Sequence, residues 1–174
     1  VLKRLPEDGD NPKLLRSAVF RFLSRVAILN LADRVEMTAY SMLIHTAGKT
    51  NDHTRDQKAV QNIIEILSDR THKKFKQYSN ELLEVCVKQI SHYEHDYSPI
   101  EVALFINKNI GKSEVLVINH KNDSDNVKRA GVPRALFTFA IGGNIVSRGL
   151  TFDNLLTFFF SRNVKGRLQQ NTYI

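Results

Sequence analysis

The sequence predicts a three-layer α/β domain with a mostly parallel sheet, on three observations. Its strand-like runs are too apolar to alternate with polar residues, as expected of strands covered by helices on both faces. Segments with helical periodicity precede the first run and fill most of the chain between the first and second runs. The 174 residues are enough to bury one such core as a single domain.

The first helix is predicted to begin at Asn11 and Pro12, an N-cap residue followed by a proline in the first turn. It should extend to about Leu29, since apolar residues recur at helical spacing: Leu15, Val19, Phe22 and Val26. The polar residues 1–11 before it are predicted to be a linker. Because the chain begins with Val1 and has no initiating Met, we expect it to be a piece of a longer protein.

A short apolar run, Ala39–His45, predicts a buried strand, and helices are expected to follow it as an inserted segment of about 52–110. The second helix should end near Leu67 and the third should span Asn80–Ile90. A capping-box pattern opens the fourth helix at Ser98, with proline at its first position. The basic connector 72–78 between the second and third helices is interpreted as solvated surface.

The chain then returns to strands. Three apolar or β-branched runs are predicted to form them: Glu114–Asn119, Ala135–Ile141 and Leu155–Phe160. A polar run, His120–Arg129, separates the first two, and no element is predicted for it. Ligands of such sheets bind outside the carboxyl ends of the strands. If the sheet is parallel, the loops after His45 and after Ile141 should open on the same edge.

Composition narrows the function classes. The net charge is +7. From Arg134 to the end of the chain there are five basic residues and one acidic residue, Asp153. This local excess of positive charge favours a polyanion partner such as nucleic acid. A solvated basic face without a ligand is the alternative. No apolar run approaches the roughly 18 to 20 residues that span a bilayer, so no membrane partner is expected. The lone Cys86 lies in an apolar stretch, which predicts a buried core thiol and a cytoplasmic location.

The segment Ala47–Thr50 has the sequence Ala-Gly-Lys-Thr between a predicted strand and helix, as in a Walker A motif. A P-loop would require a glycine at position 43, and this position is Leu43. The loop is therefore too short to wrap a phosphate chain. The helix N-terminus with Lys49 and Thr50 is instead predicted to hold one phosphate of a nucleic-acid backbone.

No metal site and no catalytic residue are predicted. The histidines and acidic residues in 92–96 form a local cluster, but a structural zinc would need two further ligands. The sequence also lacks a Gly-x-Ser-x-Gly elbow for nucleophilic hydrolysis.

The most informative stretch is the glycine-rich segment between the last two predicted strands. Gly142, Gly143 and Gly149 allow close backbone approach, and Ser147 and Arg148 lie among them. Arginine offers a rigid fork of donors suited to phosphate. This composition predicts a phosphate-binding loop, and the alternative is a tight turn whose glycines serve only the chain path.

These residues also carry a family resemblance. Residues 142–151, 155–162 and 169–173, together with 41–46, are similar to the second RecA-like lobe of superfamily-two helicases. More narrowly they resemble the Z1 domain family, which is the C-terminal helicase lobe of ATPases encoded in bacterial restriction-modification systems. In this comparison 147–151 corresponds to helicase motif V and 41–46 leads into motif IV.

The resemblance implies a RecA-like fold of the P-loop NTPase type and roles for individual residues. It implies backbone-phosphate contacts to DNA at five positions: His45, Thr46, Gly142, Gly143 and Asn144. It implies a nucleotide or interlobe role for Ser147, Arg148, Gly149 and Thr151. Thr151 stands where related helicases have an aspartate that meets the ribose, so ribose recognition stays open.

The resemblance further implies that ATP and magnesium serve the complete protein, with neither bound by this piece alone. A first helicase lobe should precede Val1, and the chain should stop before motif VI, so it is expected to be inactive by itself. Expected partners are DNA, that first lobe, and a MutL-like ATPase or a nuclease subunit. Two alternatives stay open, namely a metal-dependent endonuclease domain and a non-catalytic module that docks DNA or a partner.

Overall fold

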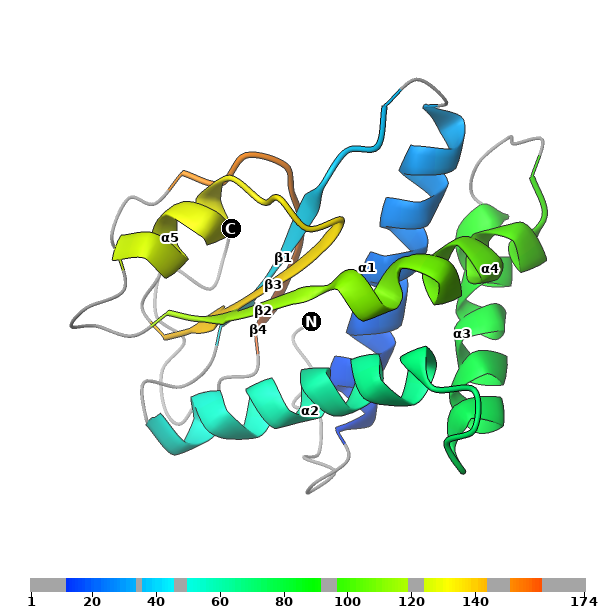
Figure 1. Ribbon diagram of the computed structural model, residues 1–174, viewed down its shortest axis with the longest axis horizontal. Coiled ribbons are helices and arrows are strands. Elements are labelled where there is room, and N and C mark those ends of the chain that lie inside the picture. The colour runs from blue at the N-terminus through cyan, green and yellow to red at the C-terminus, as the bar shows by residue number, and fades with distance from the viewer. Residues whose placement is uncertain are drawn as a thin grey trace, which may run out of the picture.

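The computed structural model describes residues 12–33, 36–45, 50–91, 97–118, 124–143 and 151–160. Within these ranges one sheet of four parallel strands lies among five α-helices (Figure 1). The strands are β1 (Tyr40–His45), β2 (Glu114–Val117), β3 (Phe137–Gly142) and β4 (Leu155–Phe160). The helices are α1 (Lys13–Ala32), α2 (Thr50–Ser68), α3 (Phe75–Ile90), α4 (Pro99–Asn109) with the 3₁₀ turn η1 (Ile110–Lys112), and α5 (Ser124–Gly131). The predicted α/β class with a parallel sheet and an inserted helical segment is confirmed.

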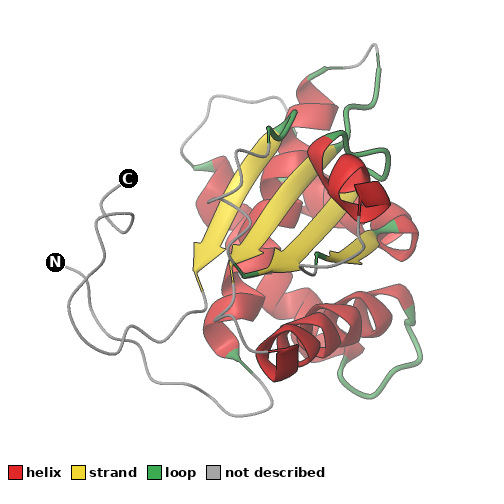
Figure 2. Cartoon of the chain, turned by 90° about the vertical axis from the view of Figure 1, so that its left-hand side faces the viewer, coloured by secondary structure: helices red, strands yellow, loops and turns green. Residues whose placement is uncertain are grey.

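The strands lie in the order β2-β3-β1-β4. β1 pairs with β3 on one side, from Tyr40 opposite Phe137 to His45 opposite Gly142, and with β4 on the other side. All four strands point the same way, so their carboxyl ends form one edge of the sheet (Figure 2). The expectation that the loops after β1 and β3 open on the same edge is confirmed.

One face of the sheet carries the main core. Phe137 and Phe139 of β3 pack edge-on against Phe22 of α1, with ring centroids 6.4 and 5.3 Å apart. Met42 and Ile44 of β1 are fully buried in the same cluster. α1 and α2 supply most of the helical side of this core, and α3 and α4 pack outside α1. Burial of this apolar surface is the main favourable term in the stability of the domain.

The seam between α1 and α3 is closed by polar contacts as well as packing. The Arg16 Nε atom donates to Glu81 at 2.7 Å, and the Ser24 hydroxyl lies 3.3 Å from the Cys86 thiol. Cys86 is completely buried, which confirms the predicted core thiol. Its burial raises the pKa of the Cys86 thiol, and the hydrogen bond with Ser24 opposes this shift without cancelling it.

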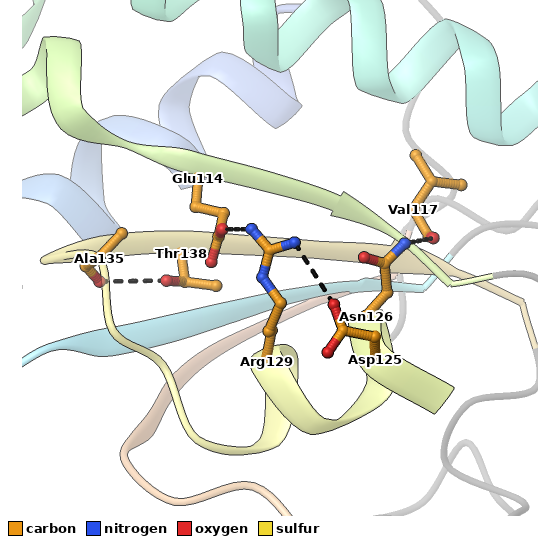
Figure 3. Close-up of polar contacts among 7 residues, drawn as sticks. All are labelled: Glu114, Val117, Asp125, Asn126, Arg129, Ala135 and Thr138. Carbon is orange, nitrogen blue, oxygen red and sulfur yellow. Dashed lines mark hydrogen bonds and ion pairs between the residues drawn. The ribbon is translucent and has the colours of Figure 1, made fainter. Parts of the chain in front are cut away.

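The opposite face of the sheet is covered by α5, which completes three layers. Arg129 of α5 pairs with Glu114 of β2, and the Asn126 amide donates to the Val117 carbonyl at 3.3 Å (Figure 3). Beneath the helix lies a small second core made of Leu43, Leu116, Ile118, Ala130 and Ala140. Ala130 of the helix and Ala140 of β3 are small, which lets the helix sit close to the strands at these two positions.

α5 occupies the polar run for which the sequence predicted no element. The helix has only eight residues and few apolar ones, so no helical stripe is visible in the sequence. Its ends carry the signals that identify it, with Asp125 in the first turn and Lys128 and Arg129 in the last. Charges placed in this way complement the helix dipole.

Three helix starts differ from prediction. α2 begins at Thr50, ahead of the expected start of the helical segment at about 52. α3 begins at Phe75, five residues earlier than expected, and absorbs part of the basic connector because Tyr78 is buried against Phe20. Pro12 occupies the cap position of α1, and Asn11 lies outside the described residues. The capping box that opens α4 is confirmed, since Ser98 and Glu101 form both of its reciprocal hydrogen bonds. None of the described helices is long and apolar enough to cross a membrane.

β4 departs from the expectation that every strand is covered. It is an edge strand paired only with β1, and no residue along it is buried. The residues just before it pass beside the end of α5, where the Asp153 amide donates to the Gly131 carbonyl at 2.7 Å. The connection into β4 therefore crosses the face that α5 covers, at the edge where the strands begin.

Replacing phenylalanine by alanine should lower the free energy of unfolding by different amounts on the two faces of the sheet. Phe139 is 0% exposed and inside the main core, so Phe139→Ala should lower the free energy of unfolding by about 3–5 kcal/mol. Phe160 is 52% exposed at the end of β4, and Phe160→Ala should cost roughly 1 kcal/mol. Urea unfolding followed by circular dichroism measures both. Equal losses of unfolding free energy in the two variants would contradict the description of β4 as an edge strand without buried residues.

The contact between α5 and the connection to β4 predicts strain at Gly131. A Cβ atom there would lie 2.9 Å from the Thr151 carbonyl oxygen, so Gly131→Ala should destabilise the domain by about 1–3 kcal/mol. Gly111→Ala is the matched control, because its Cβ would meet only the Ser68 hydroxyl at 3.5 Å. The control should be neutral or stabilising by up to about 1 kcal/mol. A neutral Gly131→Ala in thermal unfolding would show that residues 151–153 do not pack on α5.

Candidate nucleic-acid interface

The carboxyl edge of the sheet brings two of the predicted segments together. His45 is the last residue of β1, Gly142 is the last residue of β3, and the two are register partners. Gly143 follows directly in a bend. Segments 46–49 and 144–150 therefore leave the sheet from paired positions on adjacent central strands. Two loops that start side by side can contact consecutive groups of one ligand.

The His45 side chain is held inside the protein. It is 8% exposed, and its ring packs edge-on against Phe160 at 5.3 Å and lies 6.3 Å from the ring of Phe158. The two phenyl rings are themselves 4.2 Å apart. The imidazole thus anchors the end of β1 against β4. A DNA contact at this position would come from backbone groups, since the side chain faces the aromatic pair.

α2 begins at Thr50, five residues after His45. Two polar side chains in its first turns are buried. His53 is 7% exposed and Asp56 is 2% exposed. Both continue the buried side of α2, whose buried apolar residues are Val60, Ile63, Ile66 and Leu67. The Arg55 Nε atom lies 3.7 Å from an Asp56 carboxylate oxygen. Burying such groups is costly unless they are paired, and the ion pair with Arg55 offsets part of that cost for Asp56.

His53 and Asp56 were not singled out from the sequence, although the signal for them was there. The stripe of α2 has the spacing 53, 56, 60, 63 and 67, and polar residues occupy its first two positions where the period calls for apolar ones. A polar residue on the buried face of a helix is more informative than a charged residue on its outer face.

The structure does not bring Thr151 to this edge. Its carbonyl oxygen lies beside Gly131 at the end of α5, and its side chain is exposed. β4 starts four residues later and has six residues, so this position and the carboxyl edge are separated by about 16 Å of strand. In this arrangement Thr151 is not a neighbour of His45 and Gly142.

The remaining predicted site residues lie outside the described structure. These are Thr46, Lys49, Asn144, Ser147, Arg148 and Gly149, and for Thr50 only its place at the start of α2 is described. The paired strand ends and the first turn of α2 are thus the framework from which these residues extend.

The described groups at this edge are donors of the kind that bind phosphate. Across the described ranges, no group of three or more His, Cys, Asp and Glu side chains is arranged to hold a metal ion. The described groups that follow the two strand ends along the chain are the backbone of 142–143 after β3, and the N-terminus of α2 with the partly exposed Arg55 after β1. Backbone amides, a helix N-terminus and a guanidinium are the donors that bind phosphate without reading bases.

Comparison with known proteins gives one match. The family described as the Z1 domain matches residues 14–168. No curated protein and no solved structure gave a match. The matched residues run from the first turn of α1 past the end of β4 and include both strand ends of the candidate site. The chain therefore belongs to the Z1 domain family.

Proposed function

We propose that this chain is the second RecA-like lobe of an ATP-dependent DNA helicase or translocase of a bacterial restriction-modification system, acting in the cytoplasm. Its role is to hold the DNA backbone and to complete an ATP·Mg cleft supplied mainly by a first lobe. A MutL-like ATPase or a nuclease subunit is a further proposed partner. Family membership, the parallel three-layer fold and the charge of +7 agree with this role.

The observation that carries the proposal is the register pair His45 and Gly142. Ligands of open parallel α/β sheets bind outside the carboxyl ends of the strands, where these two residues lie. Because His45 and Gly142 are paired, segments 46–49 and 144–150 follow adjacent strand ends. A displacement of one strand end would therefore be transmitted to the other. The proposed division is that 46–49 and 142–144 touch phosphates, and that Ser147, Arg148 and Gly149 face the other lobe.

Thr151 is the weakest member of the proposed set. It is placed beside Gly131 at the opposite edge, so a ribose contact from this position needs a rearrangement of the connection to β4. His53 and Asp56 are stronger candidates for supporting the ligand-binding segments, because both are buried and lie in the first turns of α2. We propose that they position the segment between β1 and α2.

The proposal predicts a coupling defect for Arg148→Ala in the complete protein. Removing the guanidinium should lower DNA stimulation of ATP hydrolysis by roughly 5- to 150-fold, which is the range of a typical coupling free energy. The fold should be unaffected in thermal unfolding. Steady-state ATPase assays with and without duplex DNA measure the effect.

Arg134→Ala is the matched control. Arg134 is exposed and precedes β3, at the edge of the sheet away from the strand carboxyl ends, so its loss should leave the stimulation unchanged. Equal effects of the two changes would point to general charge and favour a docking module. ATP hydrolysis by the 174-residue chain alone at the rate of the complete protein would overturn the proposal.

A further inference from the structure

A shallow groove follows the seam between α1 and α3 on the surface of the helical layer. It encloses about 730 Å³. Arg21, Arg25 and Lys88 line it together with Ser17, Gln89 and Ser91. The two helices lie side by side and run in the same direction (Figure 1). Three cations therefore face one another across a single groove.

The charges along this seam are unevenly balanced. Near the start of α1, Arg16 is nearly buried and forms an ion pair with Glu81 of α3. Two turns further on, Arg25 meets the neutral Gln89, whose Oε1 atom accepts from the Arg25 Nε at 3.1 Å. Of the described residues, none forms an ion pair with Arg21, Arg25 or Lys88. The charge of Arg16 is therefore neutralised by an ion pair within the fold, and the three charges that line the groove are not paired in this way with any described residue.

Packing alone does not account for this arrangement. Arg21 and Arg25 are one helical turn apart, where like charges repel and destabilise a helix. Both side chains are exposed, so neither is needed to fill the core. Glu84 of α3 lies one turn before Lys88 and does not line the groove. A bound anion would offset the repulsion.

The lining identifies the kind of anion. Arginine and lysine accompanied by serine hydroxyls and a glutamine amide are the side chains that contact phosphate and sugar oxygens of nucleic acids. Val85 is the one apolar residue of the lining, so the groove offers little to an apolar segment. We propose that this groove binds the sugar–phosphate backbone of a nucleic acid without reading its sequence.

This site is separate from the edge formed by His45 and Gly142. Asn30, near the end of α1, donates to the Thr38 carbonyl at 3.0 Å, two residues before β1 begins. The second half of α1, with Arg25, therefore lies toward the edge of the sheet where strands begin. A nucleic acid held here would be a second contact, outside the proposed interlobe cleft.

The test uses the 174-residue chain and a labelled 20-base-pair duplex DNA of mixed sequence, with affinity measured by fluorescence anisotropy at several salt concentrations. R21Q/R25Q/K88Q should weaken binding at low salt by roughly tenfold or more. It should also reduce the slope of log affinity against log salt by about 3, near 0.9 for each lost phosphate contact. K58Q/K108Q/K112Q removes the same charge from scattered exposed lysines and should reduce the slope by less than about 1.

Four results would overturn the proposal. One is an equal effect of the clustered and scattered variants, and a second is no binding by the unaltered chain. Another is a loss of binding in Lys49→Gln with none in the groove variant, which would leave the proposed function standing. The last is displacement of the DNA by poly-glutamate at equal charge, which would indicate an acidic protein partner. If thermal unfolding shows that the triple variant does not fold, Arg21→Gln alone should still lower the slope by about 0.9.

Discussion

The parallel pairing of β1 with β3 is the constraint on which the rest of this structure depends. It runs over six residue pairs and ends with His45 opposite Gly142. A one-residue shift of this register would send Met42 and Ile44 to the face under α5, where the cluster is small and shaped for Leu43 and Ala140. The large core against α1 and α2 therefore fixes the register. The register in turn fixes which two loops leave the sheet side by side.

Some of the buried polar residues of this protein lie around these strand ends. His45, His53 and Asp56 are all buried, and all lie at or just after the carboxyl end of β1. Elsewhere along α2 the same buried stripe is apolar. Buried polar groups cost stability unless they are satisfied. Five further buried polar residues lie on other parts of the chain: Arg16, Ser24, Asn30, Ser41 and Thr138. The three at or after the end of β1 lie near the edge at which ligands of parallel sheets bind.

Much of the fold was predictable because strong local signals agreed with the tertiary contacts. The strand Leu155–Phe160 and the capping box at Ser98 were predicted to the residue. The start of α3 was misplaced because the burial of Tyr78 outweighs the polarity of its neighbours. α5 was missed because a short helix over a small cluster of buried residues needs few apolar side chains of its own.

The candidate site was predictable in part. The glycine pair and the end of β1 were identified from the sequence, because a glycine-rich turn after an apolar run is a local pattern. The positions of His53 and Asp56 depend on which face of α2 meets the sheet, and that is set by packing. The separation of Thr151 from the strand ends depends on the contact with Gly131, which joins residues that are distant in the sequence.

The central claim is that the carboxyl ends of β1 and β3 form one DNA-backbone site. Amide chemical shifts of the isotope-labelled chain, followed during titration with a short duplex DNA, test it most directly. The amides of His45, Gly142 and Gly143 should shift together with a single apparent affinity, and Gly131 at the opposite edge should stay unchanged. Shifts confined to the α1–α3 groove, or different affinities at His45 and Gly142, would contradict the claim.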